Sequence, residues 1–391
     1  MNWIEVILRI SLIIVFYTFV GYGILLYLFV FLKRIFKPID TQPAVDFEPP
    51  LTLVVPCFNE ADIMEKKIIN CRELDYPLQK FSIIFITDGS TDHFAEILAK
   101  YPDIQSLHED RRAGKAAAEN RAMHFVKTPI VIFSDANAIL NNKSIRHIVK
   151  HFADEKTGCV SGEKRIQGDL SDSASAAGEG IYWQYESWLK KLDSELNSAV
   201  GAVGELVAFR TSLYEQLPED TLVDDFMQSM QIAAKGYKIV YEPGAFAVEA
   251  ASLNVKEELK RKIRISTGNW QAIQRLSGKI QVTKTPILFF QYISHKVLRW
   301  SVTPFLLPLI FLLNIPLAMN GDVFFEGLFW TQASFYMIAV AGYAFENRHT
   351  RFTAFFIPYY FCVMNYAALA GLAKFLSGRH TANWEKAKRR P

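Results

Sequence analysis

Three long stretches of the sequence almost lack charged side chains, and they constrain the fold most. They are residues 10–32, 301–345 and 352–373, in which Asp322 and Glu326 are the only charges. Each stretch reaches or exceeds the roughly 20 residues with which a helix crosses a bilayer. The first is too long for a signal-peptide core and lacks a small-residue cleavage site, so we expect a retained N-terminal anchor.

Basic residues predict how these spans are oriented. Lys33, Arg34 and Lys37 follow the first span, which by the positive-inside rule places its C-terminal end in the cytosol. Three further spans would leave the C-terminal tail outside. The C-terminal tail is basic, which favours the cytosolic side instead. Its basic residues are Arg379, Lys386, Lys388, Arg389 and Arg390. A re-entrant segment among the spans would remove this conflict.

The overall composition excludes two other classes of protein. The net charge of +3 is too small to indicate a nucleic-acid-binding protein. The four cysteines show no paired spacing, so they indicate reduced core residues and not a disulfide or zinc framework.

Between the first and second uncharged stretches, short apolar runs alternate with helical patterns. This alternation predicts an α/β domain with a mostly parallel sheet. The expected strands are residues 51–56, 81–86, 104–107 and 130–134, and the expected helices are residues 60–73, 92–100, 114–126 and 143–153.

Further along, the pattern indicates a Ser-rich loop over residues 168–180 and then an aromatic helical face over residues 181–196, beside Lys190 and Lys191. Such a face suits a helix at the membrane surface or a helix that faces the core, and both interpretations stay open. Residues 255–276 predict a basic helix, and residues 286–300 a second interfacial helix.

Three acidic segments stand where they could reach one rim of the sheet. Asp135 follows the apolar run 130–134, Asp88 ends an earlier strand, and Asp224 and Asp225 precede a helix. Ligands bind open α/β sheets at the carboxyl ends of their strands, and carboxylate oxygens suit Mg²⁺ or Mn²⁺. The alternative is that each Asp is a turn former, a helix cap or a partner of the helix dipole.

A cluster of cations precedes the predicted helix at residue 114. Arg111, Arg112 and Lys115 lie near its N-terminus and suit a phosphate clamp. Solvated surface charge is the competing interpretation.

Together these segments resemble glycosyltransferase family two, in particular its membrane-integrated branch of cellulose, chitin, hyaluronan and poly-N-acetylglucosamine synthases. Residues 55–60 (Val-Pro-Cys-Phe-Asn-Glu) resemble the opening motif of the family's GT-A domain, and residues 135–137 (Asp-Ala-Asn) its D-x-D motif. Asp224-Asp225 resembles the end of its T/E-D motif, and residues 261–265 stand where the synthases carry Q-x-x-R-W.

The resemblance implies roles for individual residues. Asp225 would be the catalytic base, and Asp135 and Asn137 would hold Mg²⁺ or Mn²⁺. Acceptor contacts would come from Glu205, Asp224 and Trp270. The nucleotide-sugar contacts would be Pro56, Asn59, Glu60, Asp88, Lys115, Asp135 and Arg264.

Two positions depart from the family pattern. The D-x-D motif ends in Asn137, which is a neutral ligand. Ile265 replaces the tryptophan of Q-x-x-R-W on which a growing polymer would stack, so processivity is left open.

The resemblance implies an inverting membrane glycosyltransferase, a hexosyl- or N-acetylhexosaminyltransferase that uses a UDP-sugar to extend a polysaccharide in the bacterial inner membrane. The alternative is a single transfer to a lipid acceptor such as polyprenyl phosphate, ceramide or diacylglycerol. A non-catalytic transporter is disfavoured because the spans carry few polar residues. Whether an accessory subunit is needed stays open.

The expected organisation follows from these features. The segments are an N-terminal transmembrane anchor (1–37), a linker (38–50), a GT-A domain with a Rossmann-like sheet (51–250), basic and interfacial helices (251–300), transmembrane helices (301–376) and a basic C-terminal tail (377–391).

Overall fold

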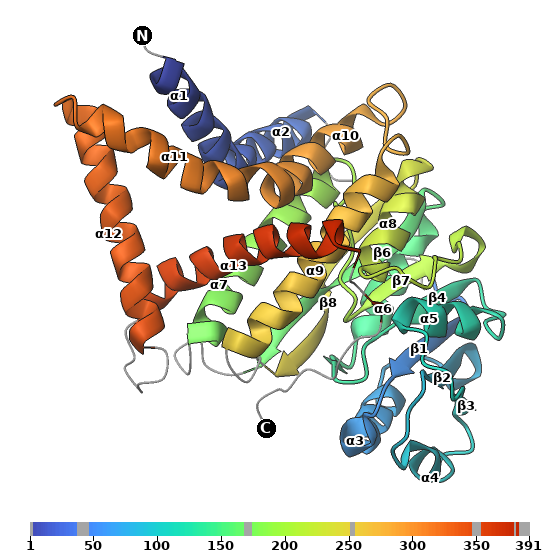
Figure 1. Cartoon of the computed structure of the whole chain (residues 1–391). Helices are drawn as coiled ribbons and strands as arrows, with labels where there is room; N and C mark the ends of the chain where they lie inside the picture. Colours follow the sequence, from blue (N-terminus) through green and yellow to red (C-terminus); the bar gives the residue numbers. More distant parts are fainter. Residues whose placement is uncertain are drawn as a thin grey trace.

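A computed structural model describes residues 3–36, 47–167, 174–250, 255–345, 353–378 and 381–382 (Figure 1). Most of the expected linker and of the basic tail therefore lies outside the described residues, as does the first half of the expected loop at residues 168–180.

The centre of the chain forms one eight-stranded sheet in the order β3-β2-β1-β4-β7-β6-β8-β5. β3, β2, β1 and β4 are parallel, as are β6 and β8, whereas β7 is antiparallel to both of its neighbours and β5 to β8. The expected mostly parallel sheet is confirmed. The strands are β1 (Leu51–Cys57), β2 (Phe81–Thr87), β3 (Gln105–Leu107), β4 (Ile130–Phe133), β5 (Ile139–Leu140), β6 (Thr157–Gln167), β7 (Val207–Arg210) and β8 (Lys238–Ala250).

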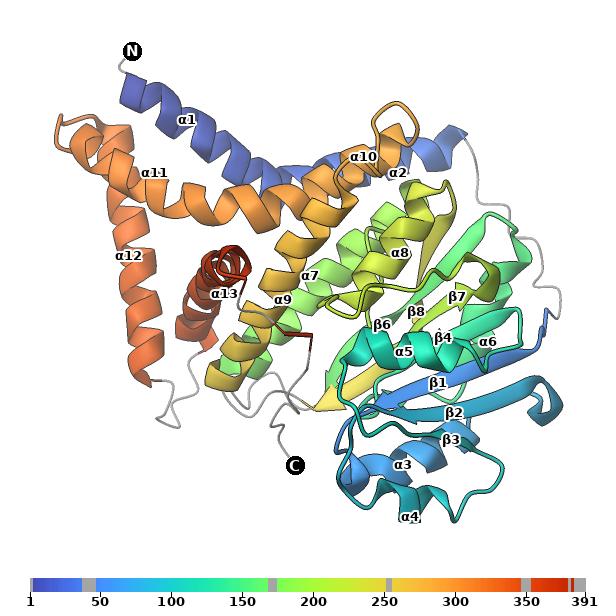
Figure 2. The same ribbon diagram turned by 45° about the vertical axis from the view of Figure 1, so that its right-hand side comes forward.

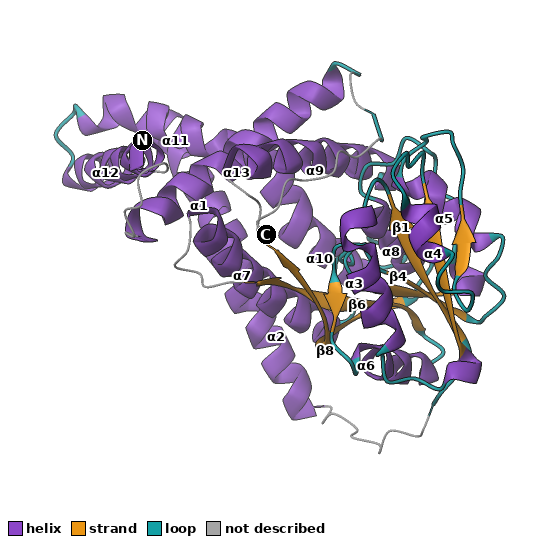
Figure 3. Ribbon diagram, turned by 90° about the horizontal axis from the view of Figure 1, so that it is seen from below, coloured by secondary structure: helices purple, strands orange, loops and turns teal. Residues whose placement is uncertain are grey.

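Helices cover both faces of the sheet, which explains why every residue of β1 and β4 is buried (Figure 3). Leu53 and Val55 pack on one side with α3 (Ala61–Arg72), α4 (Phe94–Leu98) and α6 (Ser144–Val149). Val54 and Val131 pack on the other with α5 (Lys115–Met123) and α8 (Asp224–Ala234).

The helix α7 (Ala174–Leu196) begins six residues before residue 180, so the second half of the expected Ser-rich loop is helical. Alanine is the strongest helix former and occurs repeatedly from residue 174 on, which outweighs the serine and glycine signals. Leu189 and Leu192 of α7 pack against Tyr22 and Leu26 of the first span. On that side, α7 faces a protein core and not open solvent.

Four described helices are long and apolar enough to cross a membrane (Figures 1 and 2). The first, Trp3–Phe36, joins α1 (Trp3–Phe16) to α2 (Tyr22–Phe36) through a π-helical turn. The second, Pro286–Ala318, joins α10 (Pro286–Tyr292) to α11 (Thr303–Ala318) through a π-helical segment at Ile293–Val302. The others are α12 (Val323–Phe345) and α13 (Thr353–Leu376).

The expected helix over residues 286–300 is present and continues into α11 without a break. Its position at the membrane interface stays a prediction.

The last helix returns to the sheet domain. A side chain built on Gly371 of α13 would lie 2.5 Å from Ser266 Cβ of α9 (Val255–Leu276), so the two helices are in close contact. Further along, Ala382 lies against Gly114, because a Cβ built on that glycine would be 3.0 Å from Ala382 Cβ. Residues 381–382 therefore lie beside the sheet domain.

Candidate active site

A cavity of about 1040 Å³ opens at the carboxyl ends of β1 and β4, where open α/β sheets bind ligands. Its walls come from distant segments of the chain, because the sheet brings strand ends together and α8 and α9 close over them. The lining includes Pro56, Glu60, Lys115, Asp135, Asn137, Glu205, Asp224, Asp225 and Arg264.

Lys115, the first residue of α5, links two of the acidic segments. Its ammonium group lies 2.7 Å from Asp135 Oδ1 and 3.5 Å from Asp224 Oδ2. It thereby connects the end of β4 with the N-terminus of α8, 89 residues further along the sequence. Two of the three predicted acidic clusters do meet in one cavity.

Asp225, which follows Asp224 in the chain, lies near Lys115 as well, and Gly204 shows this. A Cβ built on this glycine would lie 3.2 Å from Lys115 Nζ and 3.3 Å from Asp225 Oδ2. Lys115 Nζ and Asp225 Oδ2 therefore both lie close to Gly204.

Asp225 is a carboxylate whose pKa suits proton transfer near neutral pH. Burial, together with the charge of Asp224, raises the pKa of Asp225 to about 7, although Lys115 opposes the shift. A carboxylate with such a pKa takes up and releases protons near neutrality, as a general base must.

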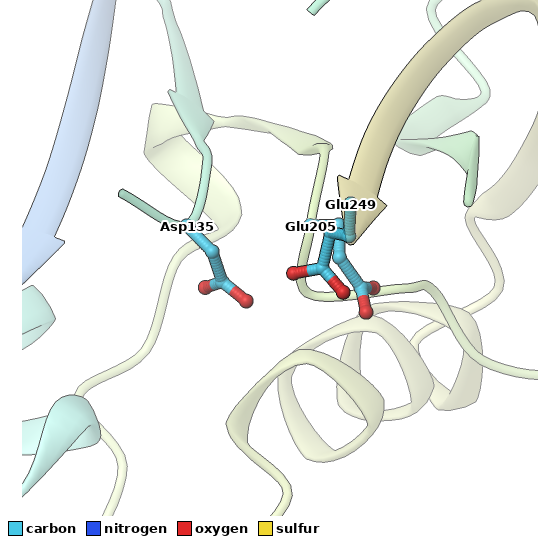
Figure 4. Close-up of side chains that lie close together, drawn as sticks. All are labelled: Asp135, Glu205 and Glu249. Carbon is cyan, nitrogen blue, oxygen red and sulfur yellow. The ribbon is translucent and has the colours of Figure 1, made fainter. Parts of the chain in front are cut away.

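A second group of carboxylates consists of Asp135 and two glutamates beside it (Figure 4). Oxygen atoms of Asp135, Glu205 and Glu249 all lie within 4.8 Å of one another. Lys164 partly neutralises the negative charge of this group, because its ammonium group lies 2.6 Å from Glu205 and 2.7 Å from Glu249. Burial alone would raise the pKa of Glu205, but Lys164 outweighs it and lowers that pKa to about 2.

This second group fits a hard divalent cation. The lowered pKa of Glu205 keeps this carboxylate ionised, and Glu205, Asp135 and Asn137 all line the cavity. Mg²⁺ and Mn²⁺ prefer such oxygen ligands. The residues that would hold the ion are Asp135, with Glu205 and Asn137 beside it.

Asp88 has a different place from the other aspartates. It is fully buried and does not line the cavity; its carboxylate accepts hydrogen bonds from the backbone amides of Ala113, at 3.0 Å, and Gly114, at 2.7 Å. Asp88 therefore fixes the start of α5, from which Lys115 points into the cavity. Its contact with the nucleotide sugar remains a prediction.

Two more predicted contacts lie outside the cavity lining. Asn59 has a left-handed backbone (φ 52°) and accepts a hydrogen bond from the Thr91 amide at 2.8 Å. Trp270 lies on α9, but the cavity is lined by its neighbour Asn269 instead. The roles of Asn59 and Trp270 stay predictions.

The expected phosphate clamp is only partly brought together. Lys115 lines the cavity, whereas Arg111 is exposed and pairs with Glu219 at 3.0 Å. The Arg112 guanidinium lies 3.6 Å from the centre of the Phe58 ring. Arg264 supplies a second cation from α9, and the family resemblance implied a nucleotide-sugar contact for this residue.

Sequence reasoning missed Lys164 and Glu249. Both are buried inside strands, Lys164 in β6 and Glu249 in β8, and their side chains pair across the two strands. The only sequence signal was a Glu at an inward position of β8, since Glu249 alternates with the buried residues Ala245 and Ala247.

Comparison with known proteins relates part of the chain to a family. Residues 52–217 match the model described as Glycosyl transferase family 2. The chain therefore carries a glycosyltransferase family two domain, which confirms the resemblance seen in its motifs.

Curated relatives are bacterial enzymes. The chain is 26% identical over 261 residues to the poly-beta-1,6-N-acetyl-D-glucosamine synthase of Staphylococcus aureus (strain MSSA476), an alignment that covers 63% of this chain and 61% of that protein. It is 23% identical over 278 residues to the synthase of the same name from Staphylococcus epidermidis, covering 68% and 66%. These alignments span less than two thirds of the relatives' length.

Among solved structures, the fold is similar to that of the mannosyltransferase PcManGT from Pyrobaculum calidifontis, determined in complex with GDP-Man and Mn²⁺. The TM-score is 0.73 at 24% identity, over 96% of this chain and all of that one. The expected GT-A-like fold is confirmed.

Proposed function

We propose that this protein is an inverting membrane glycosyltransferase that moves N-acetylhexosamine from a UDP-sugar to a growing polysaccharide. Support comes from the relatives, which are named as poly-beta-1,6-N-acetyl-D-glucosamine synthases. The observation that carries the proposal is the meeting of Asp225, Lys115 and Asp135 in one cavity beside four candidate spans.

In the proposed reaction, Asp225 accepts the proton of an acceptor hydroxyl. That oxygen attacks the anomeric carbon of the donor as the bond from this carbon to the diphosphate breaks, so UDP leaves with the bonding electrons and the configuration inverts. Lys115 and Arg264 are placed to balance the negative charge on the departing diphosphate.

A bound Mg²⁺ or Mn²⁺ would add to this stabilisation of the diphosphate as a Lewis acid. Asp135, Glu205 and Asn137 are the residues proposed to hold it. The solved neighbour named above contains Mn²⁺, which supports the proposal of a divalent metal.

We also propose that the protein is a multi-pass protein of the bacterial inner membrane with the sheet domain in the cytosol. Lys33 and Arg34 at the end of the first span contact α7 next to the sheet domain: Lys33 donates to the Leu196 carbonyl at 2.9 Å, and Arg34 pairs with Glu195. The position of Ala382 beside Gly114 supports a cytosolic tail, so α13 would be re-entrant or interfacial.

The test is a screen of radiolabelled UDP-sugars with the full-length protein in membranes, followed by sizing of the product. We expect UDP-N-acetylglucosamine to be consumed and to yield a ladder of oligosaccharides. A single lipid-linked sugar would support the lipid-acceptor alternative. No turnover of any UDP-sugar would overturn the proposal.

A further inference from the structure

A buried lysine of α3 lies behind the turn that carries Asp135. Lys67 is 0% exposed, although a lysine side chain is almost never fully buried unless it is paired. In the part of the chain that the structure describes, Lys67 forms no ion pair. Its ammonium group instead donates hydrogen bonds to two neutral oxygens, Ser134 Oγ at 2.8 Å and the Ala138 carbonyl oxygen at 2.5 Å.

These two oxygens stand at the two ends of one tight turn. The turn begins at Asp135 and ends at Ala138, whose amide donates a hydrogen bond to the Asp135 carbonyl at 3.1 Å. Ser134 is the residue immediately before it. Lys67 therefore bridges the entrance and the exit of the turn that carries Asp135 and Asn137, two of the residues proposed to hold the metal ion.

Ser134 extends this link to the third proposed ligand. Its hydroxyl accepts the hydrogen bond from Lys67 and donates one to the Glu205 carbonyl oxygen at 3.0 Å. A chain of hydrogen bonds thus runs from Lys67 through Ser134 to the backbone of Glu205. It connects α3 with both segments whose carboxylates, those of Asp135 and Glu205, have oxygens within 4.8 Å of each other.

The competing explanation is that Lys67 simply attaches α3 to the sheet domain. Asn70, about one turn further along α3, already does this with a neutral amide. Its side chain accepts a hydrogen bond from the Leu140 amide at 2.9 Å and donates one to the Leu140 carbonyl at 2.8 Å. Leu140 lies beyond the turn, so Asn70 touches neither of its ends. Attachment alone does not require a buried charge, which is costly to place there.

Support from behind the ligands is what a metal site needs. Mg²⁺ demands a nearly ideal arrangement of its oxygen ligands, so a turn that shifts between conformations binds it less well. The carboxylates of Asp135 and Glu205 also repel each other when both are ionised and no cation lies between them. A backbone that is held on both sides keeps the two groups close despite this repulsion.

We propose that Lys67 is a positioning residue of the metal site: it fixes the turn of Asp135 and, through Ser134, the backbone of Glu205. Lys67 acts through these residues and touches neither the ion nor the sugar nucleotide. The inference deepens the proposed function and rests on it, because it presupposes the divalent cation that Asp135 and Glu205 are proposed to hold.

The experiment measures the binding of Mn²⁺ to the full-length protein in detergent, with and without UDP. Electron paramagnetic resonance reports the free Mn²⁺ and gives its Kd without any turnover. The variants are Lys67→Met, which removes the charge, and Ser134→Ala, which removes only the hydroxyl. The matched control is Asn70→Ala, which cuts two hydrogen bonds from the same helix but none to the turn.

We expect Lys67→Met to raise the Mn²⁺ Kd by about 10–100-fold, the loss typical of a group that supports metal ligands, and Ser134→Ala to raise it in the same direction. The Mn²⁺ concentration that gives half-maximal donor turnover should rise by the same factor, and saturating Mn²⁺ should restore most of the rate. Asn70→Ala should lower the unfolding temperature while its Mn²⁺ Kd stays within about twofold of the wild type.

Three results would overturn the inference. They are an unchanged Mn²⁺ Kd in Lys67→Met, an equal rise of the Kd in Asn70→Ala, and a wild type that binds no Mn²⁺ either with UDP or without it. If Lys67→Met does not fold, Ser134→Ala takes its place in the first comparison.

Failure of the proposed function gives a different pattern, because Mn²⁺ binding is measured without turnover. A wild type that binds Mn²⁺ and loses this affinity in Lys67→Met, yet consumes no UDP-sugar, would refute the enzyme and leave the positioning role of Lys67 in place.

Discussion

Asp225 combines position and acidity in the way that a catalytic base requires. It lies in the cavity beside Gly204 and Lys115, and burial with a second carboxylate next to it raises its pKa to about 7. Asp225→Asn keeps the size of the side chain but cannot accept a proton. We expect transfer to fall by about 10²–10⁴-fold while donor affinity is retained, measured by initial rates and donor Kd.

Asp110→Asn is the control for this variant, because the Asp110 side chain is fully exposed and its nearest ionic partner is His108. A variant at Asp225 that keeps more than a third of the wild-type rate would show that another group takes the proton.

The same acidity predicts how activity depends on pH. A base must be ionised, so kcat/KM should rise as pH passes through about 7 and be roughly tenfold lower at pH 6 than at pH 8. The folded protein binds this proton more tightly than the unfolded chain, so the stability contributed by protonated Asp225 is lost as pH rises from about 4 to about 7. A rate profile that is flat across pH 6 to 8 would contradict the prediction.

The carboxylates around Asp135 predict a metal requirement. EDTA should abolish donor turnover, and added Mn²⁺ or Mg²⁺ should restore it in the wild type but not in Asp135→Ala. Mn²⁺ should also raise the unfolding temperature of the wild type more than that of the variant, because an ion that binds only the folded state stabilises it. Full activity in EDTA would remove the metal from the mechanism.

At the scale of elements, the contact between α13 and α9 connects a candidate membrane span to the site. A Cβ at Gly371 would meet Ser266 Cβ at 2.5 Å and the Ser266 carbonyl carbon at 2.9 Å, which leaves no room for a side chain. Gly371→Leu should push the helices apart, cost about 1–3 kcal/mol, and reduce activity because α9 also carries Arg264 into the cavity.

Gly327 of α12 provides the matched control for this change. A Cβ there would meet nothing within 4 Å, and Gly327→Leu brings the same gain in helix propensity. In detergent, Gly371→Leu should unfold at a lower temperature and turn over less donor than Gly327→Leu. Equal melting temperatures of the two variants would show that the contact between α13 and α9 is not tight.

The individual elements were also the part that the sequence predicted best. Apolar runs that end in turn residues marked β1, β2 and β4, because a strand covered on both faces must be continuously apolar. The start of α7 was missed since alanine-rich helix and small-residue loop look alike, and the antiparallel direction of β7 has no local signature.

For the molecule as a whole, the sequence predicted the site less completely than the fold. Motif order identified Asp135, Asp224 and Asp225, which the structure brings to one cavity. The pair between Lys164 and Glu249 spans 85 residues, and the approach of Lys190 to the same space depends on how α7 crosses the sheet. Contacts between such distant residues follow from tertiary packing, which periodicity does not encode.

The cavity takes its walls from both ends of the chain, since Phe19 of the first span and Phe361 of α13 both line it. Phe19 is synthesised hundreds of residues before Phe361, so a chain that ends before α13 lacks part of this wall. We therefore expect full donor turnover only from a chain that has completed its last helix.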